Sequence, residues 1–526
     1  MFTLYPKRNE SVNNAVNSYR LFYMKYEPTI GIEIHVELKT KSKMFCSCPN
    51  GFGLEREPNV DVCPVCTGQP GVLPVINEEA VHMVLKAGLA LNGQIGDSAK
   101  FDRKNYFYPD LPKGYQISQY DKSLVEGGWL DVDNGSGLVR VGITRIHLEE
   151  DTGSLNHPAG ADYSLVSLNR AGVPLMELVT QPDIKSGSQA RKFCQELQMI
   201  FRYLGISDAD MEKGQMRCEV NISLREIAEQ RGTGARNNAE KLGTKVEIKN
   251  LNSFRAVEKS IDYEIKRQGE ALEEKEKIIQ ETRGWDDAAG ITVSQRTKEE
   301  AHDYRYFPEP DLPPLTGLVE ISERLRSELP ELPAQKRERF AKEYKLSAAD
   351  TEIFVINFEL GDYFEKVVSE IKSWAEDAEP KIDPAKAVKL AANYLITELQ
   401  KLIYQSGAAF EKIKITPENF AEFVKLTAQG VVHSSGAQVL LAEMFATGSD
   451  PSHIVKEKDL AQVSDEEELN AAVLDVISKN PGPVGDYKKG KQPALMFLVG
   501  KVMAATRGKA NPQIVIRILK GELGKK

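Results

Sequence analysis

The ten residues Thr29–Leu38, which read TIGIEIHVEL, constrain the fold of this chain more than any other stretch. From Ile30 onwards every second side chain is aliphatic, and this alternation predicts a β-strand with one buried face. The other face would carry Glu33, His35 and Glu37, roughly 6.5–7 Å apart along the strand. Two carboxylates around an imidazole suit a metal ion or a polar substrate, although an ordinary solvent-exposed strand face is the alternative.

Four of the six cysteines form two close pairs, with fourteen residues between the pairs: Cys46, Cys48, Cys63 and Cys66. The chain has no secretory signal, so we expect a reducing, cytoplasmic location. In that compartment two such pairs favour a tetrahedral zinc site over disulfides. Residues 46–66 hold too few apolar side chains for a core of their own, so a structural Zn²⁺ would stabilise this zinc loop.

A further carboxylate lies inside a buried-strand pattern. The heptapeptide VPLMELV places Glu177 among apolar neighbours. An unpaired buried carboxylate costs on the order of several kcal/mol, and a metal ion or a cation such as Arg170 would relieve that cost. Another strand-like segment, RVGITRIHLEED, ends in three acids that include Glu149 and Glu150. Three segments therefore offer carboxylates to one polar site.

Residues 100–121 mix aromatic rings with basic side chains. Their prolines and glycine exclude a long helix, and the composition is typical of a binding loop. A loop that packs its rings under a sheet is the alternative. We expect both features, with Lys104 and Lys113 directed at an anionic substrate.

The order of patterns along the chain predicts a multidomain α+β protein. Four prolines within residues 308–314 mark a stiff boundary, so a mixed α/β domain should span residues 27–317. Everything beyond is helical in pattern, with a helical domain at 318–430 and a smaller helical tail domain at 431–526. We interpret residues 1–26 as a dispensable extension or a misplaced start rather than a targeting segment.

The charge of the chain is uneven. The formal net charge is −9, yet residues 481–526 contain ten Lys and Arg against two Asp and Glu. A basic end on an acidic body suggests local contact with a polyanion such as a nucleic acid, with a solubilising tail as the alternative. No apolar run reaches the roughly 18 residues of a membrane span, so no membrane contact is expected.

Longer motifs then occur in a fixed order: IGIEIHVELKT, KFDRKNYFYPD, ITRIHLEED, LNRAGVPLMELV, DYRYFPEPDLPPL and DYKKGKQPALMFLVGKVMAATRGKANP. From about residue 27 to its end, the chain resembles the B-subunit family of aspartyl/glutamyl-tRNA amidotransferases. The last motif looks like the YqeY-type tail of that family. Residues 1–26 and the loop near 227–243 depart from the family pattern.

The resemblance implies a kinase-like α/β cradle, a helical domain and a helical tail that hold tRNA. It implies an enzyme that corrects misacylated Glu-tRNA(Gln) or Asp-tRNA(Asn). The B subunit would use ATP to phosphorylate the side-chain carboxylate of the tRNA-bound amino acid. The A subunit, an amidase, would supply ammonia from glutamine, and the small C subunit would complete a heterotrimer.

The resemblance also assigns roles to single residues. The Mg²⁺ ligands would be Glu33, His35, Glu149, Glu150 and Glu177, and the four cysteines match a zinc-binding version of the loop. The catalytic residues would be Glu33, His35, Glu150, Glu177 and Lys104. No G-x-x-x-x-G-K-[ST] motif occurs, so ATP would be bound by the metal, by backbone groups and by Lys104, Lys113 and Arg170.

Two other functions stay open at this point. A non-catalytic tRNA-binding protein would use the basic tail and keep the carboxylates as structural groups, so that replacement of Glu177 would leave its function intact. A metal-dependent hydrolase built on the same acidic cluster would turn over substrate without partner proteins.

Overall fold

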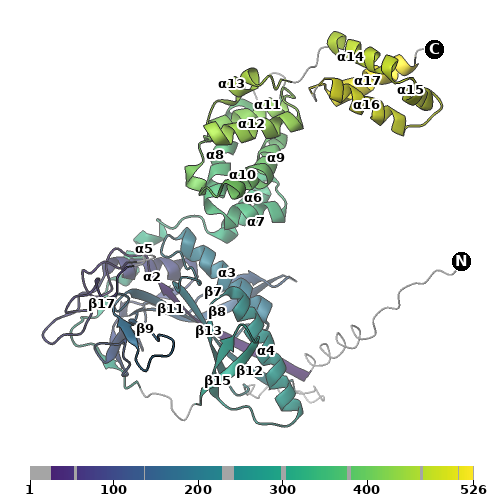
Figure 1. Cartoon of the computed structure of the whole chain (residues 1–526). Coiled ribbons are helices and arrows are strands. Elements are labelled where there is room, and N and C mark those ends of the chain that lie inside the picture. The colour runs from purple at the N-terminus through teal and green to yellow at the C-terminus, as the bar shows by residue number, and fades with distance from the viewer. Residues whose placement is uncertain are drawn as a thin grey trace. The chain divides into compact units, whose positions relative to one another are not determined.

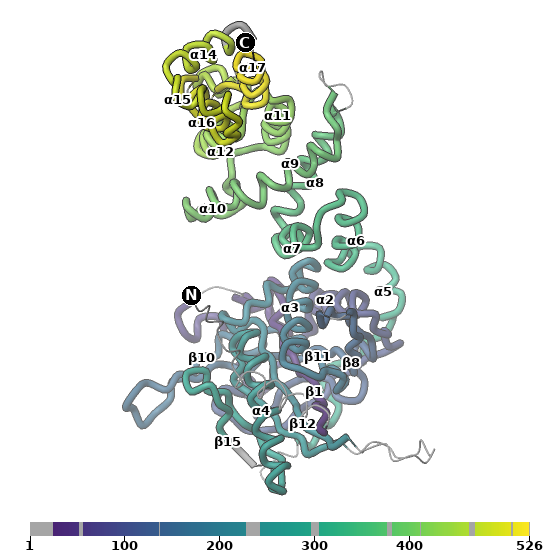
Figure 2. Tube along the Cα trace, turned by 90° about the vertical axis from the view of Figure 1, so that its right-hand side faces the viewer, coloured from purple at the N-terminus to yellow at the C-terminus, as the bar shows by residue number. Residues whose placement is uncertain are grey.

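The protein is described by a computed structural model, and the chain divides into two units, Met1–Pro333 and Ala334–Lys526 (Figures 1 and 2). The structure describes residues 25–51, 56–135, 137–227, 242–297, 304–375, 381–461, 466–506 and 509–524. The first unit combines sheets with helices and the second is helical, which confirms the predicted multidomain α+β class. The predicted N-terminal extension lies outside the described residues, apart from Lys25 and Tyr26.

A ten-stranded sheet dominates the described part of the first unit, and all the neighbouring strands on its path are antiparallel except β13 and β14. Its order is β15-β14-β13-β12-β1-β11-β8-β6-β2, and β7 also pairs with β8. The strands are β1 (Tyr26–Glu37), β2 (Gln94–Ile95), β6 (Val125–Glu126), β7 (Trp129–Asp133), β8 (Leu138–Glu150), β11 (Pro174–Thr180), β12 (Met216–Glu226), β13 (Val246–Leu251), β14 (Glu281–Asp286) and β15 (Ile291–Thr297).

The predicted central strand is β1, and it pairs with β11 on one side and β12 on the other. Its aliphatic side chains are buried, which confirms the prediction from alternation; they are Ile30, Ile32, Ile34, Val36 and Leu38. They belong to one core with helices α2 (Glu78–Ala90), α3 (Gly187–Tyr203) and α4 (Phe254–Glu273). The opposite face of β1 is therefore left for polar side chains.

Short strands from the aromatic-rich segment pair with the proline-rich segment. The pairs are β4 (Asp102–Asn105) with β5 (Tyr115–Ser118) and β16 (Phe307–Pro308), and β3 (Ser98–Ala99) with β17 (Leu315–Thr316). The four prolines of residues 308–314 also predict the absence of regular structure there, and this is wrong at β16, because a proline is tolerated on an edge strand where its missing N–H is not needed. Arg103 fixes this pairing by donating two hydrogen bonds, of 2.7 and 2.8 Å, to the buried carboxylate of Glu309.

Helix α5 (Leu318–Arg326) belongs to the core of the first unit through Leu318 and Leu325. In the second unit one hydrophobic core runs from Phe340 to Val455 and another from Leu469 to Leu523. The first core includes residues of α12 (Ser434–Thr447) and α13 (Pro451–Glu457), so it continues past residue 430. The domain boundaries expected at residues 317 and 430 stay predictions.

The helices of the second unit are α6 (Pro333–Tyr344), α7 (Ala348–Ile356), α8 (Phe358–Ala375), α9 (Pro384–Tyr394), α10 (Gln400–Ser406), α11 (Pro417–Ala428), α12 (Ser434–Thr447), α13 (Pro451–Glu457), α14 (Glu466–Lys479), α15 (Pro481–Lys488), α16 (Pro493–Ala505) and α17 (Pro512–Gly524). Within the described parts of the chain, no helix combines the length and the apolar character that crossing a membrane requires.

Candidate active site

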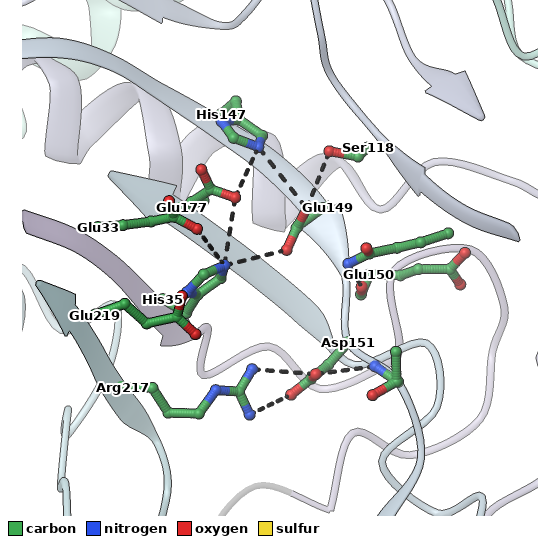
Figure 3. Close-up of polar contacts among 12 residues, drawn as sticks. Glu33, His35, Ser118, His147, Glu149, Glu150, Asp151, Glu177, Arg217 and Glu219 are labelled. Carbon is green, nitrogen blue, oxygen red and sulfur yellow. Dashed lines mark hydrogen bonds and ion pairs between the residues drawn. The ribbon is translucent and has the colours of Figure 1, made fainter. Parts of the chain in front are cut away.

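The register of the central sheet aligns polar residues from neighbouring strands in one row. His35 of β1 lies opposite Glu177 of β11, and Glu177 lies opposite His147 of β8. Arg217 of β12 extends the row on the other side of His35. Directly paired residues point to the same face of a sheet, so the four side chains lie on one polar face. There His35, Glu177 and His147 contact one another, whereas Arg217 binds Asp151 (Figure 3).

Glu33 and Glu149 complete what we call the carboxylate–imidazole cluster: Glu33, His35, His147, Glu149 and Glu177. His35 Nε2 lies 3.3 Å from Glu177 Oε2 and 3.7 Å from both Glu33 Oε1 and Glu149 Oε1. His147 Nε2 lies 3.4 Å from Glu177 Oε2 and 3.8 Å from Glu149 Oε2. The side chain of Glu33 is 30% exposed, against 6% for Glu177 and 2% for Glu149. A ligand therefore reaches the cluster most readily from the Glu33 side.

Charges inside the cluster perturb one another. Burial and the carboxylate of Glu177 raise the pKa of Glu33 to about 7. Burial disfavours a charged His147, yet Glu177 and Glu149 outweigh it and raise the pKa of His147 to about 9. Burial likewise opposes ionisation of Glu177, but His147 and His35 hold its pKa well below the ordinary value. The buried carboxylate thus has the partners that its burial demands.

The donor set fits a divalent cation. Glu33, His35 and Glu177 each offer a ligand atom, and these atoms all lie within 4.8 Å of one another. His147, Glu149 and Glu177 meet the same condition, with Glu177 shared between the two sets. Carboxylate oxygens are the ligands that Mg²⁺ prefers, while an imidazole suits Mn²⁺ better.

Lys104, on β4, is brought close to this cluster. Its ammonium lies 5.1 Å from the centre of the Tyr304 ring. Burial opposes its charge, but Glu149, Tyr306 and Glu177 raise its pKa. Lys104 therefore stays cationic beside the carboxylates, where it can bind an anionic group.

Glu150 and Lys113 are not brought into the cluster. The backbone N–H of Ile117 donates a 2.9 Å hydrogen bond to Glu150 Oε1, and Lys113 Nζ lies 2.5 Å from the same carboxylate. Consecutive residues of a strand point to opposite faces, and β8 continues through Glu150. Glu149 and Glu150 could face the same site only if the strand ended before Glu150. Because β8 includes Glu150, the two side chains point to opposite faces.

Arg170 also lies elsewhere. Its guanidinium donates to the carbonyls of Thr152, at 3.1 Å, and Gly153, at 2.6 Å. An arginine that does lie beside Glu177 is Arg145, whose Nη2 is 3.7 Å from Glu177 Oε1. The expected relief of Glu177 by Arg170 is therefore wrong.

The sequence patterns do not identify His147 and Ser118 as site residues, although both contact the cluster. The hydroxyl of Ser118 donates a 3.0 Å hydrogen bond to Glu149 Oε2. Alternation in RVGITRIHLEED places Arg145, His147 and Glu149 on one face, so the signal for His147 was present. Nothing in the sequence brings β5, which carries Ser118, beside β8.

The four cysteines of the zinc loop converge. Their Sγ atoms all lie within 4.8 Å of one another, and Cys63 Sγ and Cys66 Sγ are 3.9 Å apart. Zn–S bonds of about 2.3 Å give a tetrahedron with sulfur–sulfur edges of about 3.8 Å, so the donor set fits Zn²⁺. A hydrogen bond from Cys46 lowers the pKa of Cys66 to about 4, with a smaller contribution from Lys43.

Lys43 was also missed, and it is fully buried. Its Nζ donates hydrogen bonds to the carbonyls of Asp61, at 2.7 Å, and Leu168, at 3.3 Å, and lies 3.7 Å from Cys66 Sγ. A buried ammonium requires such partners. The side chain therefore ties the zinc loop to the turn that leads into β11 and Glu177.

Comparison with known proteins gives two family matches. A family model described as the GatB/GatE catalytic domain matches residues 28–323, and one described as a GatB domain, of the Yqey type, matches residues 362–523. Curated relatives from several organisms match nearly the whole chain. Three of them carry a name that identifies the B subunit of aspartyl/glutamyl-tRNA(Asn/Gln) amidotransferase.

The relative from Thermoanaerobacter pseudethanolicus is 48% identical over 502 residues, covering 95% of this chain and 100% of its own length. The one from Persephonella marina is 49% identical over 496 residues, covering 94% of this chain and 99% of its own length. The one from Thermotoga maritima is 46% identical over 500 residues, covering 94% and 98%.

Proposed function

The chain belongs to the GatB/GatE family as the B subunit of a tRNA-dependent amidotransferase, a ligase, and on this basis we propose that ATP phosphorylates a tRNA-bound amino acid within its carboxylate–imidazole cluster. The substrates are Glu-tRNA(Gln), Asp-tRNA(Asn) or both. Ammonia from the A subunit, an amidase, then displaces the phosphate, giving Gln-tRNA(Gln) or Asn-tRNA(Asn). The small C subunit completes the heterotrimer, which works in the cytoplasm.

The observation that carries this proposal is the meeting of Glu33, Glu149 and Glu177 with two imidazoles on one sheet face. A side-chain carboxylate is a poor electrophile, and conversion to an acyl phosphate gives it a good leaving group. Phosphoryl transfer needs positioned groups that neutralise phosphate charge more than it needs covalent help. Three carboxylates without a cation would repel a nucleotide, so the cluster requires one.

Glu33, His35 and Glu177 would hold Mg²⁺, or Mn²⁺, at the exposed side of the cluster. The cation, when bound, neutralises phosphate oxygens and orients them. The protein supplies the rest. Lys104 binds a phosphate or the substrate carboxylate. Ser118 and His147 hold Glu149 in place through the contacts given above. Zn²⁺ on the four cysteines has a structural role, because four thiolates leave no position for substrate.

Reconstitution tests the proposed function. The chain is combined with its two partner proteins, the amidase and the small third component, and with ATP, Mg²⁺, glutamine and Glu-tRNA(Gln). Gln-tRNA(Gln) is then quantified. We expect product only when the chain, ATP and the tRNA substrate are all present. Absence of product from the complete mixture would contradict the proposal. ATP turnover by the chain alone, without tRNA, would contradict it in favour of a hydrolase.

Glu149 and Glu150 provide a matched pair of neighbouring carboxylates. Glu149→Gln should lower amidation on the order of 10²-fold, because it removes a charge that faces His35, His147 and Lys104. Glu150→Gln should instead weaken stability by about 3–5 kcal/mol, because it leaves the half-buried Lys113 without its partner. Steady-state kinetics and urea unfolding of both variants measure these effects. Equal kinetic losses in both variants would place Glu150 in the catalytic machinery after all.

The basic tail is proposed to bind the tRNA backbone. Lys488, Lys489 and Lys491 are exposed around the end of α15, and Arg507 lies outside the described residues. Replacing the three lysines by alanine should weaken tRNA binding, and should reduce the slope of log Kd against log salt by about 1 for each phosphate that is no longer neutralised. Lys366, Lys386 and Lys401, exposed on α8, α9 and α10, serve as control positions. An unchanged slope would mean that the tail only solubilises the protein.

A further inference from the structure

Lys43 is a buried lysine whose charge has no carboxylate partner. Among the described residues two lysines are buried, Lys43 and Lys336. Lys336 Nζ lies 3.4 Å from a carboxylate oxygen of Glu365, as a buried ammonium requires. Lys43 has no exposed surface, and within the described chain its ammonium bonds to two carbonyls and one sulfur. Its negative partner must therefore be sought at the sulfur.

The sulfur of Cys66 has the surroundings of a thiolate. Lys43 Nζ donates to Cys66 Sγ at 3.7 Å, and the backbone N–H of Cys63 donates to the same sulfur at 3.2 Å. A thiolate accepts such bonds more strongly than a neutral thiol. Zn²⁺ with four thiolates carries two net negative charges, and Cys48 and Cys66 are only 9% and 5% exposed. Lys43 thus lies at the buried side of a group that is anionic when zinc is bound.

The ammonium of Lys43 also connects two separate segments of the chain. It donates to the carbonyl of Asp61, within the zinc loop, at 2.7 Å. It donates to the carbonyl of Leu168, in the turn that leads into β11, at 3.3 Å. An ammonium has three N–H donors, so one serves the zinc ligand Cys66, one the loop and one the turn.

We propose that Lys43 is a positioning residue of the zinc site, whose ammonium is the counter-charge of the zinc–thiolate group and couples zinc binding to the turn at Leu168. This inference rests on the proposed zinc site. With zinc bound, the anionic sulfurs stabilise the buried ammonium. Without zinc the ammonium loses this partner, and burial then opposes its presence beside Leu168.

A purely structural connection between the same segments provides the matched control. Asn59 Oδ1 accepts a 2.7 Å hydrogen bond from the backbone N–H of Leu168, and Asn59 Nδ2 donates to the carbonyl of Val166 at 3.1 Å. These bonds join the zinc loop to the turn without using a sulfur. The φ angle of Asn59 is 62°, which glycine adopts readily, so Asn59→Gly removes the bonds and keeps the backbone.

Zinc affinity of the full-length chain is the first measurement, made by competition with a chelator. Lys43→Met removes the charge and keeps a long apolar stem. It should bind zinc roughly 10- to 100-fold more weakly, as is common when a group that bonds to a metal ligand is removed. Lys41→Met should bind zinc like the wild type, because Lys41 is exposed two residues away in the same segment.

The second measurement separates the counter-charge from a structural connection. Co²⁺ replaces zinc, and the sulfur-to-cobalt charge-transfer band is recorded. Loss of an N–H donor raises the energy of the sulfur lone pairs, so the band should move to longer wavelength in Lys43→Met. Asn59→Gly should leave the band in place. Both variants should speed hydrogen exchange at residues 166–168 of the zinc-loaded protein.

An unchanged band in Lys43→Met, or unchanged zinc affinity, would overturn the inference. So would a band that moves as far in Asn59→Gly, because the effect would then come from loop packing. If Lys43→Met does not fold, wild-type protein with ¹⁵N-lysine and bound ¹¹³Cd decides. One lysine ammonium should show scalar coupling to ¹¹³Cd, and absence of coupling would overturn the inference. A wild type that binds neither zinc nor cobalt would contradict the zinc site itself.

Discussion

Glu177→Gln is expected to lower kcat for aminoacyl-tRNA amidation by on the order of 10²–10³-fold and to leave tRNA affinity unchanged. Glu177 is the carboxylate shared by both sets of ligand atoms, and it lies within 3.4 Å of His35 and His147. Glutamine keeps the shape and removes the charge. The buried site would then hold a cation less tightly and position phosphate less well.

The measurement is single-turnover formation of Gln-tRNA, together with the thermal unfolding midpoint of the variant. Glu126→Gln is the control, because Glu126 is an exposed acid of β6 in the same sheet. It should behave as the wild type. Retention of near wild-type amidation by Glu177→Gln would favour a chain that only binds tRNA.

Removal of zinc should release the loop that the four cysteines close. We expect about one Zn²⁺ per chain in the wild type and none after Cys63→Ser with Cys66→Ser, because each thiolate supplies one tetrahedral ligand. Structural zinc in small peptides contributes about 10–16 kcal/mol of binding free energy that is also folding free energy. Without zinc, the zinc loop should therefore lose much of its local stability.

Loss of zinc should also loosen the turn that leads into β11 and the active site. Met44 donates a 2.7 Å backbone hydrogen bond to Gly172, and Lys43 bonds to Leu168. Hydrogen exchange should therefore accelerate in residues 43–51 and 168–173 and stay unchanged in α8. Cys194→Ala is the control, because Cys194 lies in the core against Cys218 and far in sequence from the loop. Zinc content or exchange that is the same in the double variant and the wild type would contradict a zinc site here.

The sequence predicted the parts of the site that depend on local pattern. Alternation placed Glu33 and His35 on one face of β1, and the carboxylate within VPLMELV predicted that Glu177 is buried and partnered. Both follow from the period of a strand and from the cost of a buried charge. The family resemblance then supplied the reaction, which no spacing of residues could reveal.

The predictions that failed depend on which strands are neighbours in the sheet and on the direction of side chains in the turns. His147 matters because β8 pairs with β11 in a register that sets it against Glu177, and that register is not encoded in either strand alone. Glu150 was grouped with Glu149, although alternation continues to the end of β8. Arg170 is one of two partners that the sequence offers Glu177, the other being a metal ion, but from the turn that leads into β11 it donates instead to the carbonyls of Thr152 and Gly153.

We propose above that Glu33, His35 and Glu177 hold the cation to which the phosphates of ATP bind. Electron paramagnetic resonance of Mn²⁺ bound to the chain tests it most directly. With ¹⁵N-histidine-labelled protein and ATP, we expect one Mn²⁺ to show both a histidine nitrogen coupling and a ³¹P coupling, and Glu177→Gln to lose both. A bound Mn²⁺ without nitrogen coupling, or a spectrum unchanged in Glu177→Gln, would contradict the claim.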